Sequence, residues 1–179
     1  MRVLATALLA VAAGLPCPAQ QFENLAPYIP TPQTLVETIL EYGAVKPGDV
    51  VYDLGSGDGR VVITAARSFG ARGVGIEMMP ELCRAAERRI RELGLQDRVK
   101  IIQASALHVD LSPATVVTMY LLTSSNERLK PNLEKYLRPG ARVVSTDYPI
   151  RGWNPTRLKV VKTGSTEHKI YVYEIGHTK

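Results

Sequence analysis

The chain has 179 residues, the size of one domain, and its apolar content of 45% excludes a largely disordered protein. Its net charge is +5, with the basic residues spread along the sequence, so a solvated surface explains the charge better than a nucleic-acid site does. Neither the two cysteines nor the three histidines have the spacing of metal ligands.

The first 19 residues differ from the rest of the chain and predict a leader. Arg2 precedes an uncharged, mostly apolar run over residues 3–15, and small residues precede a cut expected after Ala19. This order is typical of a secretory signal peptide, and the run is shorter than the about 20 residues that span a bilayer. We expect residues 20–179 to form one domain. A cleaved leader implies export to the periplasm or medium, a retained leader implies a membrane anchor, and a later translation start implies a cytoplasmic protein.

From residue 21 onward, strand-like and helix-like segments alternate, which is typical of an α/β fold with a largely parallel sheet. Helices are predicted over residues 32–42, 61–69, 80–93 and 126–137. Strands are predicted over residues 50–54, 73–76, 99–103, 115–121, 142–146, 158–163 and 169–175. Thr31 is expected to cap the first helix, with Pro32 as its first residue, and Pro131 to break the fourth. Because Gly164 and Ser165 separate the last two strands, we expect an antiparallel hairpin at the sheet edge.

A glycine-rich segment, Asp53–Arg60, lies directly between a predicted strand and a predicted helix. Glycines there permit a tight turn and let a ligand approach the backbone closely. Gly55, Gly57 and Gly59 stand at every second position, unlike the G-x-G-x-x-G spacing of dinucleotide-binding loops. The carboxylate of Asp53 argues against a phosphate there. It favours a ligand that carries an ammonium group, such as the methionine part of S-adenosylmethionine (AdoMet).

A second acidic residue, Glu77, follows the second predicted strand. A carboxylate at this position can accept hydrogen bonds from both hydroxyl groups of a ribose. The glycine loop, Asp53 and Glu77 together therefore predict a pocket for AdoMet. Cys83, in the helix that follows, is expected to be a small apolar packing residue.

The Asp53–Arg60 segment resembles motif I of class I AdoMet-dependent methyltransferases, which have a Rossmann-like α/β fold with a mostly parallel seven-stranded sheet and a C-terminal antiparallel hairpin. Four other stretches more narrowly resemble the archaeal broad-specificity protein lysine methyltransferases and their mitochondrial relatives. They are PYIPTP (27–32), ATVVTMYLL (114–122), RPGARVVS (138–145) and RGWNP (151–155). The resemblance covers about residues 24–177 and implies methyl transfer from AdoMet to the side-chain amine of protein lysines.

The resemblance also implies a set of cofactor-binding residues. Tyr28 and Thr31 would close the pocket over AdoMet, and Ser105 stands where many class I enzymes have an adenine-binding aspartate. Thr146 stands where we expect histidine in the archaeal relatives. The full predicted cofactor-binding set is Tyr28, Thr31, Asp53, Gly55, Ser56, Gly57, Gly59, Glu77 and Ser105.

Tyr120 and Asp147 are the predicted catalytic residues, because they end the fourth and fifth strands, where class I enzymes place substrate-facing side chains. The Tyr120 ring can face a cation, and Asp147 can attract a lysine ammonium group or accept its proton. The alternatives are a packed strand-end tyrosine and a loop-capping carboxylate. Trp153 and His168 are expected to be structural.

Other functions remain open from the sequence. The fourth strand lacks the Asn/Asp-Pro-Pro-Tyr stretch of enzymes that methylate planar nitrogens, so DNA bases and glutamine amides are unexpected substrates. The alternatives are a small-molecule or RNA methyltransferase on the same fold, or a non-catalytic exported protein that binds a partner or lipid. The expected partners are proteins with exposed lysines, no metal is expected, and a monomer is the default.

Overall fold

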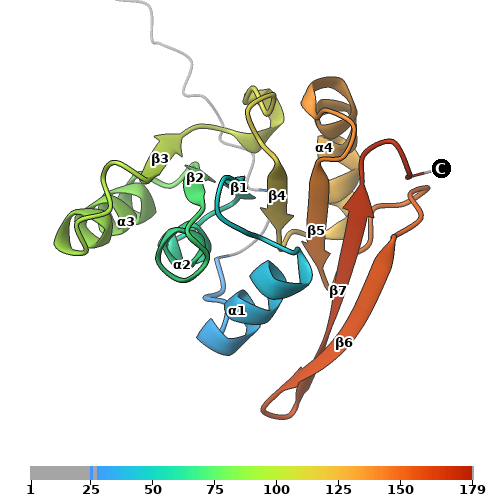
Figure 1. Ribbon diagram of the computed structural model, residues 1–179, viewed down its shortest axis with the longest axis horizontal. Coiled ribbons are helices and arrows are strands. Elements are labelled where there is room, and N and C mark those ends of the chain that lie inside the picture. The colour runs from blue at the N-terminus through green and yellow to red at the C-terminus, as the bar shows by residue number, and fades with distance from the viewer. Residues whose placement is uncertain (1–24, 26–27, 179) are drawn as a thin grey trace, which may run out of the picture.

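The computed structural model describes Leu25 and residues 28–178, and the predicted leader lies outside these residues. One sheet lies between two layers of helices (Figure 1). The strands are β1 Val50–Leu54, β2 Arg72–Glu77, β3 Val99–Gln103, β4 Val116–Met119, β5 Arg142–Thr146, β6 Arg157–Thr163 and β7 Thr166–Glu174. The α-helices are α1 Gln33–Tyr42, α2 Arg60–Phe69, α3 Pro80–Glu92 and α4 Thr123–Tyr136, and a 3₁₀ turn, η1, covers Ala106–His108. Within the described part of the chain, no helix is long and apolar enough to span a bilayer.

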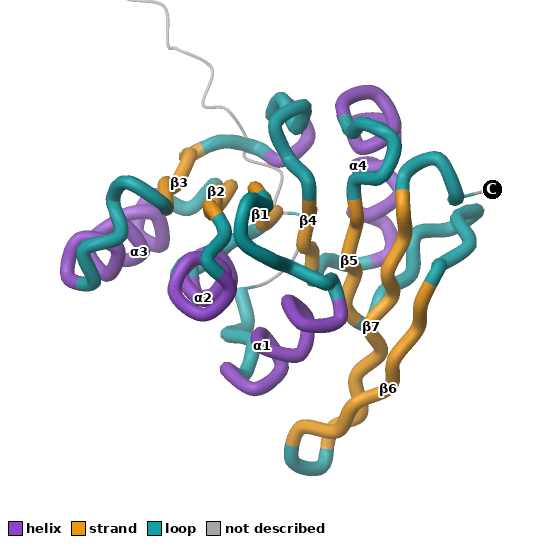
Figure 2. Tube along the Cα trace, viewed as in Figure 1, coloured by secondary structure: helices purple, strands orange, loops and turns teal. Residues whose placement is uncertain are grey.

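The strands of the sheet lie in the order β3-β2-β1-β4-β5-β7-β6, which Figure 2 shows as a continuous row. β1 pairs in parallel with both β2 and β4, whereas β7 is antiparallel to β5 and β6. The predicted seven-stranded, mostly parallel sheet with a terminal antiparallel hairpin is confirmed. The chain order reverses between β1 and β4, and such a switch point places the carboxyl ends of two neighbouring strands around a crevice.

The two faces of the sheet bury separate apolar clusters. Helices α1 and α2 lie on one face, where Leu35 and Leu40 pack with Val116 of β4. Helix α4 covers the other face, where Leu129 and Leu133 are fully buried with the residues of β1 and β4 that point to that side. Burying one such side chain contributes about 1.5–3 kcal/mol, so these leucines hold the helices against the two faces of the sheet.

Two predictions about helices were wrong. Pro32, not Thr31, is the residue that precedes the first turn of α1, and no side chain caps this helix. Pro131 does not break α4, which continues through it to Tyr136. The helix stays continuous because the leucines on both sides of the proline are buried against the sheet. The burial of both turns outweighs the backbone hydrogen bond that proline cannot donate.

The expected structural roles of Trp153 and Cys83 are confirmed. The indole of Trp153 packs against Tyr173 with 5.6 Å between ring centroids. Its Nε1–H donates to Glu134 Oε1 at 3.1 Å, so both the apolar body and the polar edge of the ring are satisfied. Cys83 is a buried free thiol on α3.

A buried ion pair joins the amino ends of three strands. Arg142, the first residue of β5, lies 2.5 Å from Asp49, which directly precedes β1. Asp49 also accepts hydrogen bonds from Thr115 Oγ1, before β4, at 2.7 Å and from the Lys46 amide at 2.9 Å. These contacts lie at the end of the sheet opposite the crevice.

Candidate functional site

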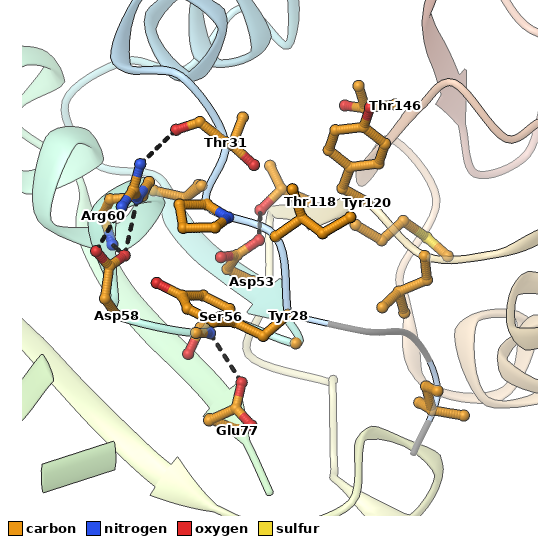
Figure 3. A pocket seen from close by; sticks show the side chains of 18 of the residues that line it. Tyr28, Thr31, Asp53, Ser56, Asp58, Arg60, Glu77, Thr118, Tyr120 and Thr146 are labelled. Carbon is orange, nitrogen blue, oxygen red and sulfur yellow. Dashed lines mark hydrogen bonds and ion pairs between the residues drawn. The ribbon is translucent and has the colours of Figure 1, made fainter. Parts of the chain in front are cut away.

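A cavity of about 600 Å³ lies at the carboxyl ends of β1, β2 and β4, as expected for the switch point of the sheet (Figure 3). Its walls come from residues 28–32, the glycine loop after β1, the turn after β2 and the ends of β4 and β5. Thr163, Thr166 and His168 of the terminal hairpin complete the lining. The volume suits a small molecule, for which pockets measure about 300–1,000 Å³.

The glycine loop fits closely under the ring of Tyr28. Gly57 has a φ of 55°, which L side chains rarely adopt, and a Cβ there would lie 2.5 Å from Tyr28 Cε2. Glycine is therefore required both by the backbone and by the approach of the tyrosine. Gly59 ends the loop with a φ of 76° and faces Ala86 of α3, away from the cavity lining. Its role in the described structure is helix packing.

Glu77 supports the loop from the end of β2. Its Oε2 accepts from the Gly57 amide at 2.8 Å, and its Oε1 accepts from the amides of Met78 and Met79 at 2.8 and 2.9 Å. The side chain lines the cavity and is 8% exposed. Because each carboxylate oxygen has two acceptor sites, Oε1 is filled and Oε2 retains one site for a hydroxyl group of a ligand.

Asp53, at the floor of the cavity, is a buried carboxyl group without a cationic partner among the described residues. Its Oδ1 accepts from Thr118 Oγ1 at 2.7 Å. Burial, with a smaller contribution from the charges of Glu77 and Asp58, raises the pKa of Asp53 to about 7 despite that hydrogen bond. The neighbouring Ser56 Oγ is buried without a hydrogen-bond partner. Asp53 is therefore suited to a polar ligand, and a cationic one would stabilise its charged form.

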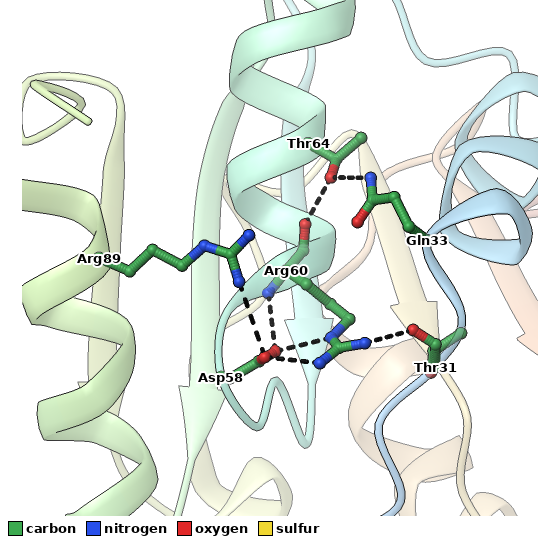
Figure 4. A network of polar contacts seen from close by, with 6 residues as sticks. All are labelled: Thr31, Gln33, Asp58, Arg60, Thr64 and Arg89. Carbon is green, nitrogen blue, oxygen red and sulfur yellow. Dashed lines mark hydrogen bonds and ion pairs between the residues drawn. The ribbon is translucent and has the colours of Figure 1, made fainter. Parts of the chain in front are cut away.

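Arg60 ties the glycine loop to the segment that covers the cavity (Figure 4). Its Nε and Nη2 donate to the two oxygens of Asp58 at 2.8 and 2.7 Å, while Nη1 donates to the Thr31 carbonyl at 2.6 Å. The guanidinium hydrogen bonds hold the pKa of Asp58 below its usual value, although burial alone would raise it. At the start of α1, Gln33 Nε2 donates to Thr64 Oγ1 of α2 at 3.0 Å. Residues 28–32 are therefore positioned by the loop that they cover.

A second polar cluster, formed by Tyr120, Asp147 and His168, lies at the end of the cavity where β4, β5 and β7 meet. Asp147 Oδ2 accepts from the Tyr120 hydroxyl and lies 2.8 Å from His168 Nδ1. Its Oδ1 accepts from the Lys169 amide at 2.8 Å. Asp147 has a φ of 61°, rare for a residue with a side chain, so this strained backbone aims the carboxylate at the other two residues.

The cluster fixes the protonation of two of its members. Burial raises the pKa of Tyr120, and the Asp147 carboxylate raises it further, so the hydroxyl stays protonated. Burial alone would raise the pKa of Asp147. The hydrogen bonds from Tyr120, His168 and Lys169 outweigh burial and lower this pKa below its usual value. The cluster thus combines a fixed negative charge with a neutral phenol.

Sequence comparison identifies the family. The sequence model of a protein family, described as the ANTKMT methyltransferase domain, matches residues 53–157. A protein-lysine N-methyltransferase of Saccharolobus islandicus is 49% identical over 154 residues, which are 86% of this chain and 96% of that protein. The chain belongs to the ANTKMT methyltransferase domain family. The resemblance to class I methyltransferases is therefore confirmed.

Two further comparisons agree with this family. The adenine nucleotide translocase lysine N-methyltransferase of Mus musculus is 32% identical over 83% of this chain and 63% of its own length. The crystal structure of an RNA methyltransferase from Salinibacter ruber, in complex with S-adenosyl-L-homocysteine, has a TM-score of 0.77 and 46% identity. That match covers 82% of this chain and 94% of the other.

Most of the predicted site residues of this methyltransferase lie around the one cavity. The predicted residues that line it are Tyr28, Thr31, Asp53, Gly55, Ser56, Gly57, Glu77 and Tyr120. Three predicted residues are outside the lining. Gly59 packs against α3, Ser105 caps η1 by accepting from the Leu107 amide at 3.4 Å, and Asp147 reaches the cavity through Tyr120 and His168.

The sequence reading missed several cavity residues. His168 was expected to be structural, yet it contacts both predicted catalytic residues. The sequence feature that could have indicated it is the alternation along the strand, which puts His168 on the same face as Thr166, Ile170 and Val172. Thr118 aligns with Asp53 only through the parallel register of β1 and β4, which the sequence does not specify. Within the described residues, no group of His, Cys, Asp and Glu side chains could hold a metal ion.

Proposed function

We propose that this methyltransferase transfers the methyl group of AdoMet to the side-chain amine of lysines in proteins. The observation that carries the proposal is the buried Asp53 carboxyl group, which lacks a cationic partner in the described structure and faces the same cavity as the Tyr120–Asp147–His168 cluster. A cavity with one acidic centre for a cationic donor and another for a cationic acceptor suits transfer between the two.

The donor half of the cavity fits AdoMet through residues of the glycine loop and β2. Asp53 would bind the polar methionine part, and the free acceptor site of Glu77 a ribose hydroxyl group. Ala104 and Ala106, which flank Ser105, line the cavity and would contact the adenine. Tyr28 and Thr31 would cover the donor. When bound, AdoMet supplies an electrophilic methyl group on a sulfonium sulfur.

The acceptor half would hold the lysine amine at Tyr120. Its hydroxyl donates to Asp147, so its oxygen can accept a hydrogen bond from the amine, and its ring can face a cation. Bringing an exposed lysine into the neutral form at pH 7 costs about 4.6 kcal/mol. An enclosed channel lowers this cost because it disfavours the ammonium form. Alignment of the amine with the methyl group is then the main task of the cavity.

Lysine in proteins is favoured over other acceptors by the relatives that are lysine methyltransferases, at 49% and 32% identity. RNA is the second candidate, because the Salinibacter protein is described as an RNA methyltransferase and is 46% identical. β4 ends at Met119 and is followed by Tyr120-Leu121-Leu122, with no Asn/Asp-Pro-Pro-Tyr stretch for a planar nitrogen. That difference supports an aliphatic amine as the acceptor.

The donor half is tested by calorimetric titration of the full chain with AdoMet. Micromolar binding is expected for the wild type, and Gly57→Ala should weaken it at least tenfold because the new methyl group displaces Tyr28. Gly94→Ala is the matched control, since Gly94 has a similar φ of 66° with open space around it. Equal affinities of the two variants would contradict the assigned role of the loop.

The acceptor is tested with tritium-labelled AdoMet at pH 9. The probe is an acetyl-capped synthetic peptide with one lysine, and the same peptide with acetyl-lysine is the control. A total RNA fraction forms the parallel arm. Label in the lysine peptide alone supports the proposal. Label in RNA alone would replace it with the RNA assignment, and no label in either would leave only the binding of AdoMet.

The leader, the boundary near residue 20 and the monomeric state stay predictions. The leader prediction is tested by N-terminal sequencing of the protein purified from its own cells. Gln20 at the terminus would establish cleavage and export, whereas Met1 would indicate an anchor or a cytoplasmic enzyme. Light scattering of the purified protein reports whether it is a monomer.

A further inference from the structure

His168 has one ring nitrogen engaged and one that is accessible. Nδ1 lies 2.8 Å from Asp147 Oδ2 and 3.3 Å from the Tyr120 hydroxyl oxygen. A carboxylate can only accept, so Nδ1 carries the hydrogen and Nε2 of the neutral ring is the free acceptor. Nε2 has no hydrogen-bond partner among the described residues. The side-chain atoms that are both unpaired and fully buried there are Ser56 Oγ and Asn126 Oδ1, so Nε2 is accessible. The side chain also lines the cavity.

From this geometry we propose that His168 takes the proton from the acceptor amine, with Asp147 orienting the ring and stabilising its charged form. The inference rests on the proposed lysine methylation and adds the proton acceptor that this reaction requires. The relation of Asp147 to His168 is that of a carboxylate that fixes the tautomer of a general base.

The other members of the cluster are poorly suited to this role. The Tyr120 hydroxyl stays protonated and already donates to Asp147, so it can orient the amine but is not a proton acceptor. Asp147 has both oxygens occupied and a lowered pKa, which makes it a weak base. Asp53 lies at the donor end of the cavity. A histidine is the side chain that accepts and releases protons most readily near neutral pH.

Several titratable and charged groups lie around His168. Asp147 is the carboxylate in contact with it, Tyr120 is the phenol beside it, and the ring of Tyr148 lies 6.3 Å from that of Tyr120. Along β7, the exposed Glu167 and Lys169 flank it and project to the opposite face of the strand. Across the hairpin its partner is the uncharged Val161. On α1, Tyr42 donates to the Leu158 carbonyl at 3.0 Å and has Lys159 Nζ over its ring.

The proton balance is simple. The substrate N–H bond breaks, the Nε2–H bond of His168 forms, and the electron pair left on nitrogen becomes the nucleophile. The positive charge moves from the substrate to the imidazolium, next to Asp147. After methyl transfer the proton leaves from Nε2 to solvent, which resets the histidine for the next turnover.

The test is the pH dependence of kcat/KM from pH 6 to 10, with the single-lysine peptide, for the wild type and His168→Gln. Glutamine can still donate to Asp147 but has no basic nitrogen. We expect wild-type activity to level off once the histidine is neutral, whereas the variant should rise about tenfold per pH unit as free amine forms in solution. Its deficit should be about 1,000-fold at pH 7 and small at pH 10. His177→Gln, at an exposed histidine, should match the wild type.

Parallel pH profiles of wild type and His168→Gln would overturn the inference, even if both transfer methyl groups to lysine. No transfer by the wild type at any pH would instead defeat the proposed function. The AdoMet affinity of the variant checks its fold. If the variant does not fold, the wild type with labelled histidines is titrated by NMR. The inference requires that the protonation midpoint of His168 equals the midpoint of the acidic limb of the kcat/KM profile, and a different midpoint would overturn it.

Discussion

The carboxyl group of Asp53 is buried near those of Glu77 and Asp58, and its pKa is raised from 3.8 to about 7, mainly by burial. The native state therefore binds more protons than the unfolded state between these two pH values. The free energy of unfolding falls as pH rises through this window. In the absence of ligand, the acidic floor of the cavity is thus a source of instability that a bound cation relieves.

Asp53→Asn should stabilise the free protein at pH 8 but not at pH 4. The amide can keep a hydrogen bond with Thr118 and avoids a buried charge, so we expect a gain on the order of 2–4 kcal/mol at the higher pH. Urea denaturation of wild type and variant at both pH values measures it. Asp110→Asn, at an exposed carboxyl group whose pKa is lowered by the Ser112 amide, should show the opposite trend. A gain that does not depend on pH would refute the assigned charge state.

At the scale of the elements, the sequence predicted which segments are helices and strands better than where they end. Strand β4 was predicted over residues 115–121 but ends at Met119, where β1 ends beside it. Beyond Met119 the chain has no parallel partner, and Tyr120, Leu121 and Leu122 turn into the cavity lining. The apolar pattern does not reveal this change, because both pairing with a strand and lining a pocket favour the same residue types.

Helix α4 keeps Pro131 within its interior, so the Glu127 carbonyl lacks its intrahelical partner. Pro131→Ala should therefore raise the free energy of unfolding by about 1–3 kcal/mol. The side chain is exposed, and no packing is lost. Thermal or urea denaturation checks the gain, and an unchanged AdoMet affinity shows that the effect is confined to the helix. A loss of stability would mean that the rigidity of proline in the unfolded chain dominates.

At the scale of the whole molecule, the alternation of segments was enough to predict an α/β sheet, but not the meeting of Tyr120, Asp147 and His168. These residues come from the ends of β4 and β5 and the middle of β7. Their contact depends on the antiparallel register that pairs Thr146 with Ile170. Pairing registers between distant strands are set by the packing of the entire sheet, and a single sequence does not display them.

The Asp49–Arg142 pair holds the amino ends of β1 and β5 together, so it should control global stability. Burial opposes ionisation of Asp49, yet hydrogen bonds from Arg142, Thr115 and Lys46 keep its pKa below 3.8. The pair therefore stabilises the fold above about pH 4, and its contribution is lost as pH falls through the lowered pKa. Asp49→Asn should cost about 3 kcal/mol at pH 7 and little near pH 2. Urea denaturation at both values tests this, and an equal loss at both would show that charge is not the cause.

The terminal hairpin supplies Thr163, Thr166 and His168 to the lining of the cavity. It joins the sheet only through the pairing of β5 with β7. Under the proposed function this edge hairpin meets the substrate, while Ile170, Val172 and Tyr173 of β7 belong to the buried core. A lineage can therefore change what it methylates by changing the cavity-facing residues of this hairpin, while the glycine loop, Asp53 and Glu77 are kept. Grafting this hairpin between relatives is the corresponding route for an engineer who wants a new acceptor on an old methyl-donor pocket.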